Sequence, residues 1–412
     1  KFVYSKLAKH GFAAFSARLT PAAVAFLTAH EAVEYVEENR EMRIFDCKEQ
    51  TNADWGTVRT NIRGDYKSGP YDYTTNASGK GVDAYIIDTG VYCENNDFTS
   101  KTTGSCSCGI DLVNGSCVDG NGHGTHCAGT VAGQRWGVAK EANLIAVRVL
   151  NNQGSGSLDA IVAGIEWAVG NMEDSGRPSV ANLSLGSSYS ASVNDATNSA
   201  VSSGLNMLVA AGNDDANACN YSPASAASAV TVGATDINDE RASYSNYGKC
   251  LDIFGPGTDI TSAWIGSPNA TKTISGTSMA TPQVCGVAAK YLSADPSMTT
   301  SQVTSKLIND ATKNILSGVN GGFNPNNPDN KSPNLMVYGY CTYTLCATQG
   351  PVYFYSNDIL LYRQAICFRH LFARYFFTRH CRCVDEYARC RKLLLSCPSI
   401  FLLYFTKFSR LF

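Results

Sequence analysis

Short apolar runs alternate with longer amphipathic stretches through the central part of the chain. Five runs rich in aliphatic and β-branched side chains predict strands: AYIID, NLIAVRVL, VANLSLG, LNMLVAAG and AVTVGAT. Residues 157 to 170, 191 to 203 and 278 to 293 have helical periodicity. Because strands that alternate with helices form parallel sheets with helices on both faces, residues 50 to 340 are predicted to form such an α/β domain.

Residues 1 to 49 predict a small α+β domain of their own. The run FAAFSARL is strand-like, and Thr20 followed by Pro21 is typical of a helix start. The helix continues through AVAFLTAHEAV, and VEYVEEN predicts a returning strand. A unit of this size buries little surface, so we expect it to dock on the domain that follows.

The composition changes at about residue 341 and stays different to residue 412. No glycine follows Gly350, and residues 351 to 412 contain ten Lys and Arg against three Asp and Glu, with fifteen Phe and Tyr. Seven cysteines lie beyond residue 340, and neither helical nor strand periodicity persists, so no fold is predicted for this tail. A membrane surface or a polyanion would suit its charge, but the scarcity of turn residues favours an unfolded or mistranslated end.

The composition and net charge of the chain argue against some classes of function. A chain of 412 residues with 44% hydrophobic content can bury a full core, and its net charge of -2 does not indicate nucleic-acid binding. No apolar run reaches the roughly 18 residues of a membrane span. The chain opens at Lys1 without a leader, so we expect any secretion signal to have been removed or to lie upstream. Sixteen cysteines and the glycosylation sequons favour an oxidising, secreted setting; the sequons are at Asn76, Asn114, Asn220 and Asn269.

Only two of the six histidines lie in the central domain, His123 and His126, within DGNGHGTHCAGT. Histidine is the side chain best suited to proton transfer near neutral pH, so a histidine base in this domain must be one of the two. Their spacing would also allow a metal pair. However, no Glu follows His123 as a zinc-protease motif requires, so a metal site is not favoured.

A carboxylate and a nucleophile for that histidine are both present. Asp88 ends the strand AYIID, and sites in α/β sheets gather at the carboxyl ends of strands. Ser278, in SGTSMATP, opens a helical run after Gly276, which lets the chain turn. Taken singly, each residue could also have a purely structural role: Asp88 as a helix cap at a strand end, and Ser278 as an N-cap. The three motifs together, in this order, predict nucleophilic catalysis.

The stretches IIDTGV, GHGTHCAGT and GTSMATP resemble the three active-site signatures of subtilisin-like serine proteases. The resemblance is strongest to the proteinase K branch, through WGVAK, AAGNDDANACNYSPAS and SNYGKCLDIFGPGTDI, and covers residues 50 to 340. Residues 1 to 49 resemble the inhibitory propeptide of these enzymes. The resemblance implies a secreted, self-processing, monomeric serine endopeptidase without a catalytic cofactor; the alternative is a catalytically silent binding protein of the same fold.

The resemblance also implies roles for individual residues. Asp88 would orient the imidazole of His123, the general base for the nucleophile Ser278, and Asn213 would donate a hydrogen bond to the oxyanion. His126 would be a structural helix residue, and Cys127 a buried free thiol. Glycines at 122 and 124 are expected to let the helix pack closely beside the sheet and to leave room for substrate.

Two segments resemble the edges between which the substrate backbone inserts as an added strand: Gly154, Ser155 and Gly156 in the first, and Ser184, Leu185 and Gly186 in the second. Strand addition ignores side chains, so it predicts broad specificity for proteins and peptides. Small residues would line a roomy apolar first pocket, namely Ala210, Ala211 and Gly212, and Leu158 resembles a lining residue of the fourth pocket. None of these carries a charge, which predicts an apolar or aromatic preference.

A structural calcium ion is implied by the resemblance of Asp252 to the family's side-chain ligand, with the carbonyls of Ala227 and Ala229 completing the site. Gln283 and Cys285 depart from the usual His and Ala of the family, which predicts altered packing rather than lost chemistry.

Cys219 and Cys250 fall where some relatives have a disulfide. Four other cysteines crowd the loop before the histidine motif and allow three pairings that the sequence leaves open: Cys93, Cys106, Cys108 and Cys117.

Overall fold

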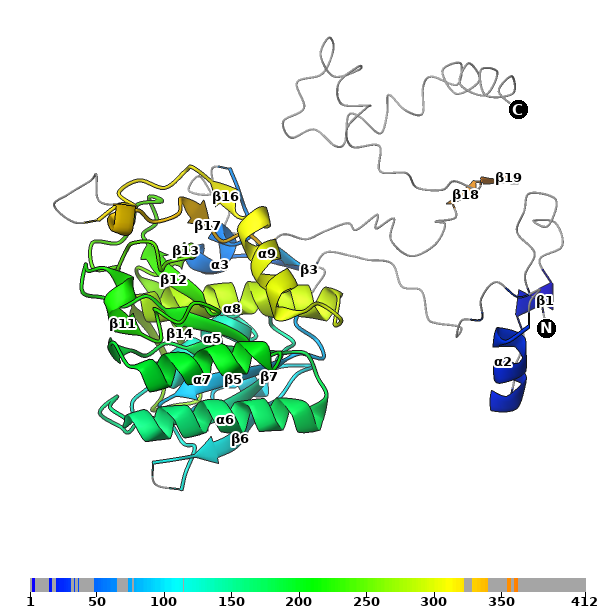
Figure 1. Cartoon of the computed structure of the whole chain (residues 1–412), viewed down its shortest axis with the longest axis horizontal. Helices are drawn as coiled ribbons and strands as arrows, with labels where there is room; N and C mark the ends of the chain where they lie inside the picture. Colours follow the sequence, from blue (N-terminus) through cyan, green and yellow to red (C-terminus); the bar gives the residue numbers. More distant parts are fainter. Residues whose placement is uncertain are drawn as a thin grey trace, which may run out of the picture. The chain divides into compact units, whose positions relative to one another are not determined.

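The computed structural model describes most of the central domain and parts of both ends (Figure 1). The described residues are 2–3, 15–16, 20–30, 33, 36, 48–64, 73–75, 78–113, 115–321, 328–339, 354–356 and 359–361. The chain divides into two compact units, Lys1–Thr342 and Tyr343–Phe412.

A nine-stranded sheet forms the centre of the first unit (Figure 1). In spatial order its strands are β16 (Thr312–Lys313), β17 (Leu335–Met336), β13 (Ile253–Pro256), β12 (Val230–Thr235), β10 (Asn206–Ala210), β8 (Ser179–Leu183), β5 (Asp83–Asp88), β7 (Asn143–Arg148) and β6 (Cys106–Asp111). All neighbours pair in parallel except β16, which runs antiparallel to β17 at one edge. The five predicted strands correspond to five neighbouring strands of this sheet, β12, β10, β8, β5 and β7, whereas β6, β13, β16 and β17 were not predicted.

Helices cover both faces of this sheet. The longer ones are α5 (His123–Ala132), α6 (Leu158–Ser175), α7 (Ala191–Ser202), α8 (Thr277–Ala294) and α9 (Thr300–Asp310). Shorter ones are α3 (Trp55–Arg59), α4 (Asn96–Thr99), η1 (Ala218–Asn220) and η2 (Pro328–Asn330). The three predicted helical stretches correspond to α6, α7 and α8, and α6 extends five residues beyond its predicted end at residue 170.

The alternation along β5 explains why the sheet needs helices on both sides. Ala84 and Ile86 pack in the core that contains α5 and α8, whereas Tyr85 and Ile87 pack in a second core with α6 and α7. All four side chains are fully buried, because successive side chains of a strand point to opposite faces. The predicted α/β fold with helices on both faces is therefore confirmed.

At the N-terminal side, the helix α2 (Pro21–Thr28) begins as predicted. Thr20 is its N-cap and accepts a hydrogen bond from the amide of Ala23 at 3.3 Å, and Pro21 occupies the first helical position. The helix ends at Thr28, earlier than the predicted continuation to residue 33. The described part of the predicted strand FAAFSARL is β2 (Phe15–Ser16), which pairs with β1 (Phe2–Val3). The rest of that run and most of VEYVEEN lie outside the described residues.

The remaining strands form small antiparallel pairs: β3 (Lys48–Gln50) with β4 (Tyr73–Thr75), β9 (Ser187–Ser188) with β11 (Tyr221–Ser222), β14 (Ile260–Ala263) with β15 (Thr271–Ile274), and β18 (Phe354–Ser356) with β19 (Ile359–Leu361). The last pair is the described part of the predicted tail, and the rest of that tail lies outside the described residues. None of the helices among the described residues has the length and apolar character needed to cross a bilayer.

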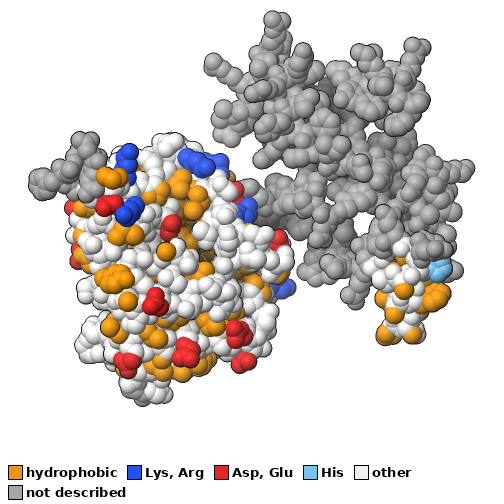
Figure 2. Space-filling model, in the orientation of Figure 1, with side chains coloured by type: hydrophobic (Ala, Val, Ile, Leu, Met, Phe, Trp, Pro, Cys, Tyr) orange, Lys and Arg blue, Asp and Glu red, His pale blue; other side chains and the backbone are white. Residues whose placement is uncertain are grey.

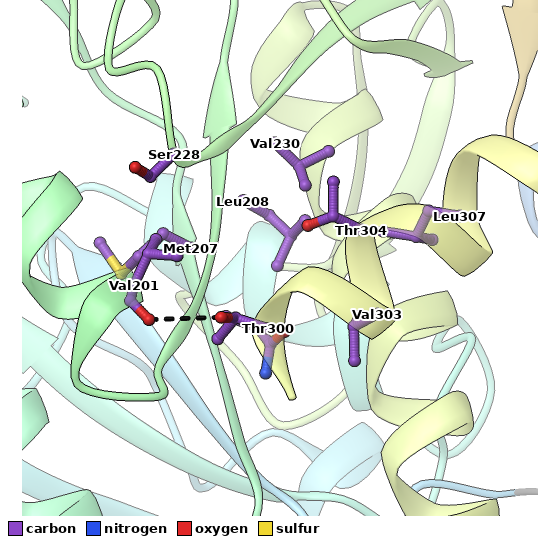
Figure 3. A pocket seen from close by; sticks show the side chains of 10 residues that line it. Val201, Met207, Leu208, Ser228, Val230, Thr300, Val303, Thr304 and Leu307 are labelled. Carbon is purple, nitrogen blue, oxygen red and sulfur yellow. Dashed lines mark hydrogen bonds between the residues drawn. The ribbon is translucent and has the colours of Figure 1, made fainter. Parts of the chain in front are cut away.

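The helix α9 packs beside β10, β12 and the end of α7 with little space left over. A cavity of about 10 Å³ lies between them, lined by Met207, Leu208, Val230 and residues of α9 such as Val303 (Figure 3). The hydroxyl of Thr300 donates to the carbonyl of Val201 across its rim at 3.3 Å. A cavity of this size holds at most about one water molecule, so it is a small packing gap and not a ligand-binding site.

The surface agrees with the low net charge. On the face that Figure 2 displays, acidic and basic side chains both occur among the described residues, separated by polar and apolar ones. This face therefore lacks the continuous basic surface that nucleic-acid binding requires.

Candidate active site

Asp88 and His123 meet at the carboxyl end of β5. Asp88 is the last residue of the strand and is fully buried, and His123 is the first residue of α5. The Nδ1 atom of His123 lies 2.8 and 3.0 Å from the two carboxylate oxygens of Asp88. The amide of Thr89 donates to the same carboxylate at 2.7 Å. The structure thus brings together the first two members of the predicted constellation.

The charge of Asp88 sets the protonation behaviour of His123. Burial lowers the pKa of His123, but Asp88 and Cys127 together raise it by more, so this pKa lies well above its ordinary value. Since an ionised carboxylate only accepts hydrogen bonds, Nδ1 carries the proton that points at Asp88. The other ring nitrogen, Nε2, is then free to accept a proton, as a general base requires.

The glycines around His123 have a steric reason. Gly122 has a φ of +104°, and a Cβ there would lie 2.4 Å from the ring of Trp264. A Cβ on Gly124 would lie 2.2 Å from the carbonyl oxygen of Gly90. Close packing beside the strand end is therefore the reason for both glycines. The expected role of these glycines in leaving room for substrate stays a prediction.

His126 is a structural residue of α5, as predicted. Its side chain is fully buried, and its Nε2 lies 3.0 Å from the carbonyl of Ile260 and 3.1 Å from that of Lys272. Burial lowers the pKa of His126 to about 4, so it stays neutral near pH 7. It ties α5 to the β14–β15 hairpin.

Ser278 lies in the first turn of α8, next to the helix that carries His123. Its hydroxyl donates to the carbonyl of Ser184 at 3.2 Å. Among the hydrogen bonds of the described residues, none joins this hydroxyl to His123, so the predicted pairing of nucleophile and base is not formed. Catalytic hydrogen bonds often tighten only when substrate binds, and a rotation about one side-chain bond would redirect the hydroxyl.

Cys127 connects the two helices beneath His123. Its sulfur lies 4.0 Å from Nδ1 of His123 and 3.4 Å from the carbonyl oxygen of Ser278. Cys127 is fully buried and unpaired, as predicted, and burial raises the pKa of its thiol. This contact places the backbone of Ser278 close to the imidazole.

Asn213 is anchored so that its amide nitrogen stays available. Its Oδ1 accepts from the amide of Thr277 at 2.8 Å and from the hydroxyl of Thr277 at 2.9 Å. The side chain is exposed, and its Nδ2 donates to none of the described residues. This orientation leaves an N–H donor beside the start of α8, where an oxyanion could be bound.

The two predicted substrate edges follow β7 and β8. Gly154, Ser155 and Gly156 are exposed and outside any strand, although Asn151 closes their turn by accepting from the amide of Gly154 and donating to the carbonyl of Ser155. In the second segment, Ser184 is buried while Leu185 and Gly186 reach the surface. Leu158, the first residue of α6, is 46% exposed.

The residues predicted to line the first pocket differ in their exposure to solvent. Ala210 and Ala211 are buried at the end of β10, so only Gly212 of the three reaches the surface. A Cβ on Gly212 would clash with the side-chain amide of Asn246 at 2.3 Å and would lie 3.7 Å from Oδ2 of Asp214. Asp214, which was not among the predicted site residues, places an acidic group beside the predicted apolar wall.

The structure resolves the open cysteine pairings. Cys93 bonds to Cys106 and Cys108 bonds to Cys117, both next to the histidine motif. The predicted bond between Cys219 and Cys250 is present.

Cys285 remains a buried free thiol, and Gln283 beside it is buried with neither side-chain amide atom hydrogen-bonded to a described residue. These two departures therefore affect how α8 packs against the residues around it.

At the predicted calcium site, Asp252 binds the backbone of the neighbouring strand β12. One of its oxygens accepts from the amide of Thr231 at 2.8 Å, and the other has no hydrogen-bond partner among the described residues. Burial raises the pKa of Asp252 to about 6, which shows that its charge is poorly compensated. Ala227 and Ala229 precede Thr231 on the same segment. A carboxylate in this state suits a cation.

Comparison with known proteins agrees with this geometry. Residues 79–339 match the subtilase family of peptidases. This chain belongs to the subtilase family. Residues 4–45 match the peptidase inhibitor I9 family, so the inhibitory propeptide predicted in residues 1 to 49 is confirmed.

Several subtilases are similar over most of the chain. A subtilisin-like serine protease, Pen c 2, of Penicillium citrinum is 43% identical over 78% of this chain and 73% of its own length. An extracellular serine proteinase of Thermus sp. strain Rt41A is 46% identical over 74% of this chain and 70% of its own. The crystal structure of a cold-adapted subtilisin-like serine proteinase superposes with a TM-score of 0.62 at 41% identity, covering 71% of this chain and all of that one. The chain is a subtilisin-like serine protease, and these relatives do not favour the silent binding protein.

Proposed function

We propose that Ser278 attacks the peptide carbonyl while His123 takes its proton, Asp88 holds the imidazole, and Asn213 binds the oxyanion of the tetrahedral intermediate. The C–N bond then breaks as His123 gives its proton to the leaving amine, and water, deprotonated by His123, hydrolyses the acyl-enzyme so that the acid leaves and Ser278 regains its proton. The contact between Asp88 and His123 at 2.8 Å carries this proposal, because it fixes the tautomer that leaves Nε2 open to the serine proton. The enzyme acts as a monomer on proteins and peptides.

A serine-directed covalent inhibitor tests this assignment. An organophosphonate should label the mature protein once, and peptide mapping should place the label on Ser278. Retained peptidase activity after complete labelling of Ser278, or a label on another serine, would contradict the proposal. A folded, propeptide-free protein without label would support the binding-protein alternative.

We also propose broad specificity with an apolar or aromatic preference in the first pocket. The backbones of residues 154–156 and 184–186 would pair with the substrate as an added strand, and Leu158 would border the fourth pocket. The acidic side chain of Asp214 is the one described feature near Gly212 that opposes this preference. The kcat/KM values for peptides with Phe or with Lys before the cleaved bond measure whether the apolar pocket or the acidic group prevails. A higher kcat/KM for Lys would contradict the apolar preference.

The enzyme works outside the cell and matures by cutting off its own propeptide. The relative from Thermus is named an extracellular proteinase, and three disulfides among the described residues fit an oxidising compartment. The processing site falls between the inhibitor match that ends at residue 45 and the peptidase match that begins at residue 79.

Replacing Asn213 by Ala should lower kcat by about 10² to 10³ and leave KM nearly unchanged, a magnitude known from subtilisin, another member of this family. The amide nitrogen meets the substrate oxygen only as negative charge develops, so its loss affects the transition state more than binding. Steady-state kinetics with Asp215→Asn as the matched control measure this, because Asp215 is exposed nearby and bonds to Arg241 instead. An equal loss in both variants would argue against the oxyanion role.

A bulky adduct on Cys127 should abolish most activity. The sulfur lies 4.0 Å from Nδ1 of His123, so a mercurial bound there must displace the imidazole, and displacements near 1 Å can cost about 100-fold in rate. Cys127→Ser should keep most activity and lose sensitivity to mercurials. If this variant stays sensitive, another thiol is responsible, with Cys285 the next candidate; if it is folded but inactive, Cys127 has a catalytic role.

Asp252 would hold a structural calcium ion together with the carbonyls of Ala227 and Ala229, and the ion would stabilise the fold without taking part in the chemistry. A chelator should therefore lower Tm and leave the initial rate of folded enzyme unchanged. Saturation at about 100 times Kd corresponds to about 2.7 kcal/mol of stability. In Asp252→Asn the chelator should have no effect on Tm. An unchanged Tm in the parent enzyme would remove the site.

A further inference from the structure

Asp119 is a buried carboxylate beside the catalytic centre that the mechanism does not use. Only 3% of its surface is exposed, and its two oxygens accept five hydrogen bonds. A carboxylate has about four lone-pair positions, so Asp119 is saturated with donors. Every one of these donors belongs to a residue next to Asp88 or close to His123.

Asp119 accepts hydrogen bonds from residues that precede His123 and from a residue that follows it in the sequence. Oδ1 accepts from the amides of Asn121 and Gly122, both at 2.9 Å, which are the two residues before the histidine. Oδ2 accepts from the amide of Thr125 at 2.9 Å and from its hydroxyl at 2.6 Å. The carboxylate therefore fixes the backbone that enters α5 and its first turn.

A third contact extends from Asp119 to the residue after Asp88. The hydroxyl of Thr89 donates to Oδ1 of Asp119 at 2.9 Å and accepts from the amide of Gly124 at 2.9 Å. The amide of the same threonine donates to Asp88. Thr89 thus connects the carboxylate of Asp88 to the helix of His123, and Asp119 holds Thr89 in place.

The glycine before His123 explains why this carboxylate is needed. Helices are usually capped by an Asp, Asn, Ser or Thr at the N-cap, but α5 has Gly122 there and no side-chain cap bond. The φ of +104° and the ring of Trp264 exclude a larger residue at that position. Asp119 supplies the missing cap from three residues earlier, where the disulfide between Cys108 and Cys117 anchors the segment.

We infer that Asp119 is a positioning residue for catalysis, which sets the orientation of His123 relative to Asp88 through Thr89 and the first turn of α5. This inference rests on the proposed roles of Asp88 and His123. An amide at this position has one acceptor oxygen in place of two, so Asp119→Asn must present N–H groups to some of the present donors. The imidazole would then be less well held, whereas none of the five donors to Asp119 belongs to the two predicted substrate edges.

The test compares kcat and KM of the full chain after maturation. Asp119→Asn should lower kcat by about 10- to 100-fold with KM within about twofold of the parent enzyme. The matched control is Asp83→Asn, which alters an equally buried carboxylate at the other end of β5, bonded to Asn143 and Arg177. This control should lower Tm and leave kcat unchanged. Titration with the serine-directed inhibitor gives the concentration of folded enzyme in each case.

A second variant decides the matter if Asp119→Asn does not fold. Thr89→Val has nearly the same shape and removes only the hydroxyl, so it should reduce kcat by about tenfold at unchanged KM. Where both variants fold, the double variant should be no slower than Asp119→Asn alone, because both act through one connection. Multiplicative losses in the double variant, or an unchanged kcat in Thr89→Val, would overturn the inference. An inactive parent enzyme would instead overturn the proposed function.

Discussion

Replacing Ser278 by Ala should abolish peptidase activity, with a loss in kcat of about 10⁶-fold, the magnitude known for this change in subtilisin, another member of the family. Without the hydroxyl no acyl-enzyme forms, so only background hydrolysis assisted by the oxyanion site remains. The precursor should also stay uncut between the propeptide and the peptidase domain, because that cleavage uses the same nucleophile.

Kinetics and gel analysis in a protease-free host measure both effects. Ser203→Ala is a suitable control, because it removes an exposed hydroxyl at the end of α7. It should process and hydrolyse normally. Normal processing of Ser278→Ala would refute self-cleavage, and normal hydrolysis would refute the nucleophile assignment.

Asp88→Asn should lower kcat by about 10⁴-fold, the effect of the corresponding change in another serine protease with the same triad. The asparagine amide can donate to Nδ1 of His123, which moves the imidazole proton to Nε2. In that tautomer the ring cannot accept the proton of Ser278. The fold should be retained because the substitution keeps the shape of the buried side chain.

The same variant should shift the pH dependence. Burial lowers the pKa of His123, but Asp88 and Cys127 together raise it by more, so in the parent enzyme the histidine becomes neutral only above its ordinary pKa of 6.5. Catalysis needs the neutral ring, so kcat/KM should rise with pH through a midpoint above that value. Without the carboxylate the midpoint should move to lower pH. A midpoint that does not move in Asp88→Asn would mean that another group causes the acid limb.

Much of the fold could be predicted because its signals are local. The run AYIID alternates between two buried faces, and Thr20 with Pro21 begins α2 through contacts within one turn. The strands β16, at one edge of the sheet, and β17, its neighbour, are two residues long, too short for a periodic pattern, so only the completed sheet defines them.

The identities of the site residues were predictable from the sequence, but the directions of their side chains were not. The motifs gave the identities of Asp88, His123 and Ser278, because family signatures are contiguous in sequence. They did not give the direction of the Ser278 hydroxyl, which depends on a carbonyl 94 residues away. They also did not disclose the acidic side chain of Asp214 beside Gly212, since the side-chain direction of a turn residue is not fixed by its neighbours in sequence.

The sequence by itself determined the family, the alternation of strands and helices, and which residue types could do the chemistry, because each of these depends on side chains within a few positions of one another. Only the tertiary structure decided the pairing of the four crowded cysteines, the exclusion of side chains at Gly122 by Trp264, and the hydrogen bond from Thr89 to Asp119. These depend on which distant segments the packed sheet brings within hydrogen-bond and van der Waals distance, and spacing along the chain does not contain that information.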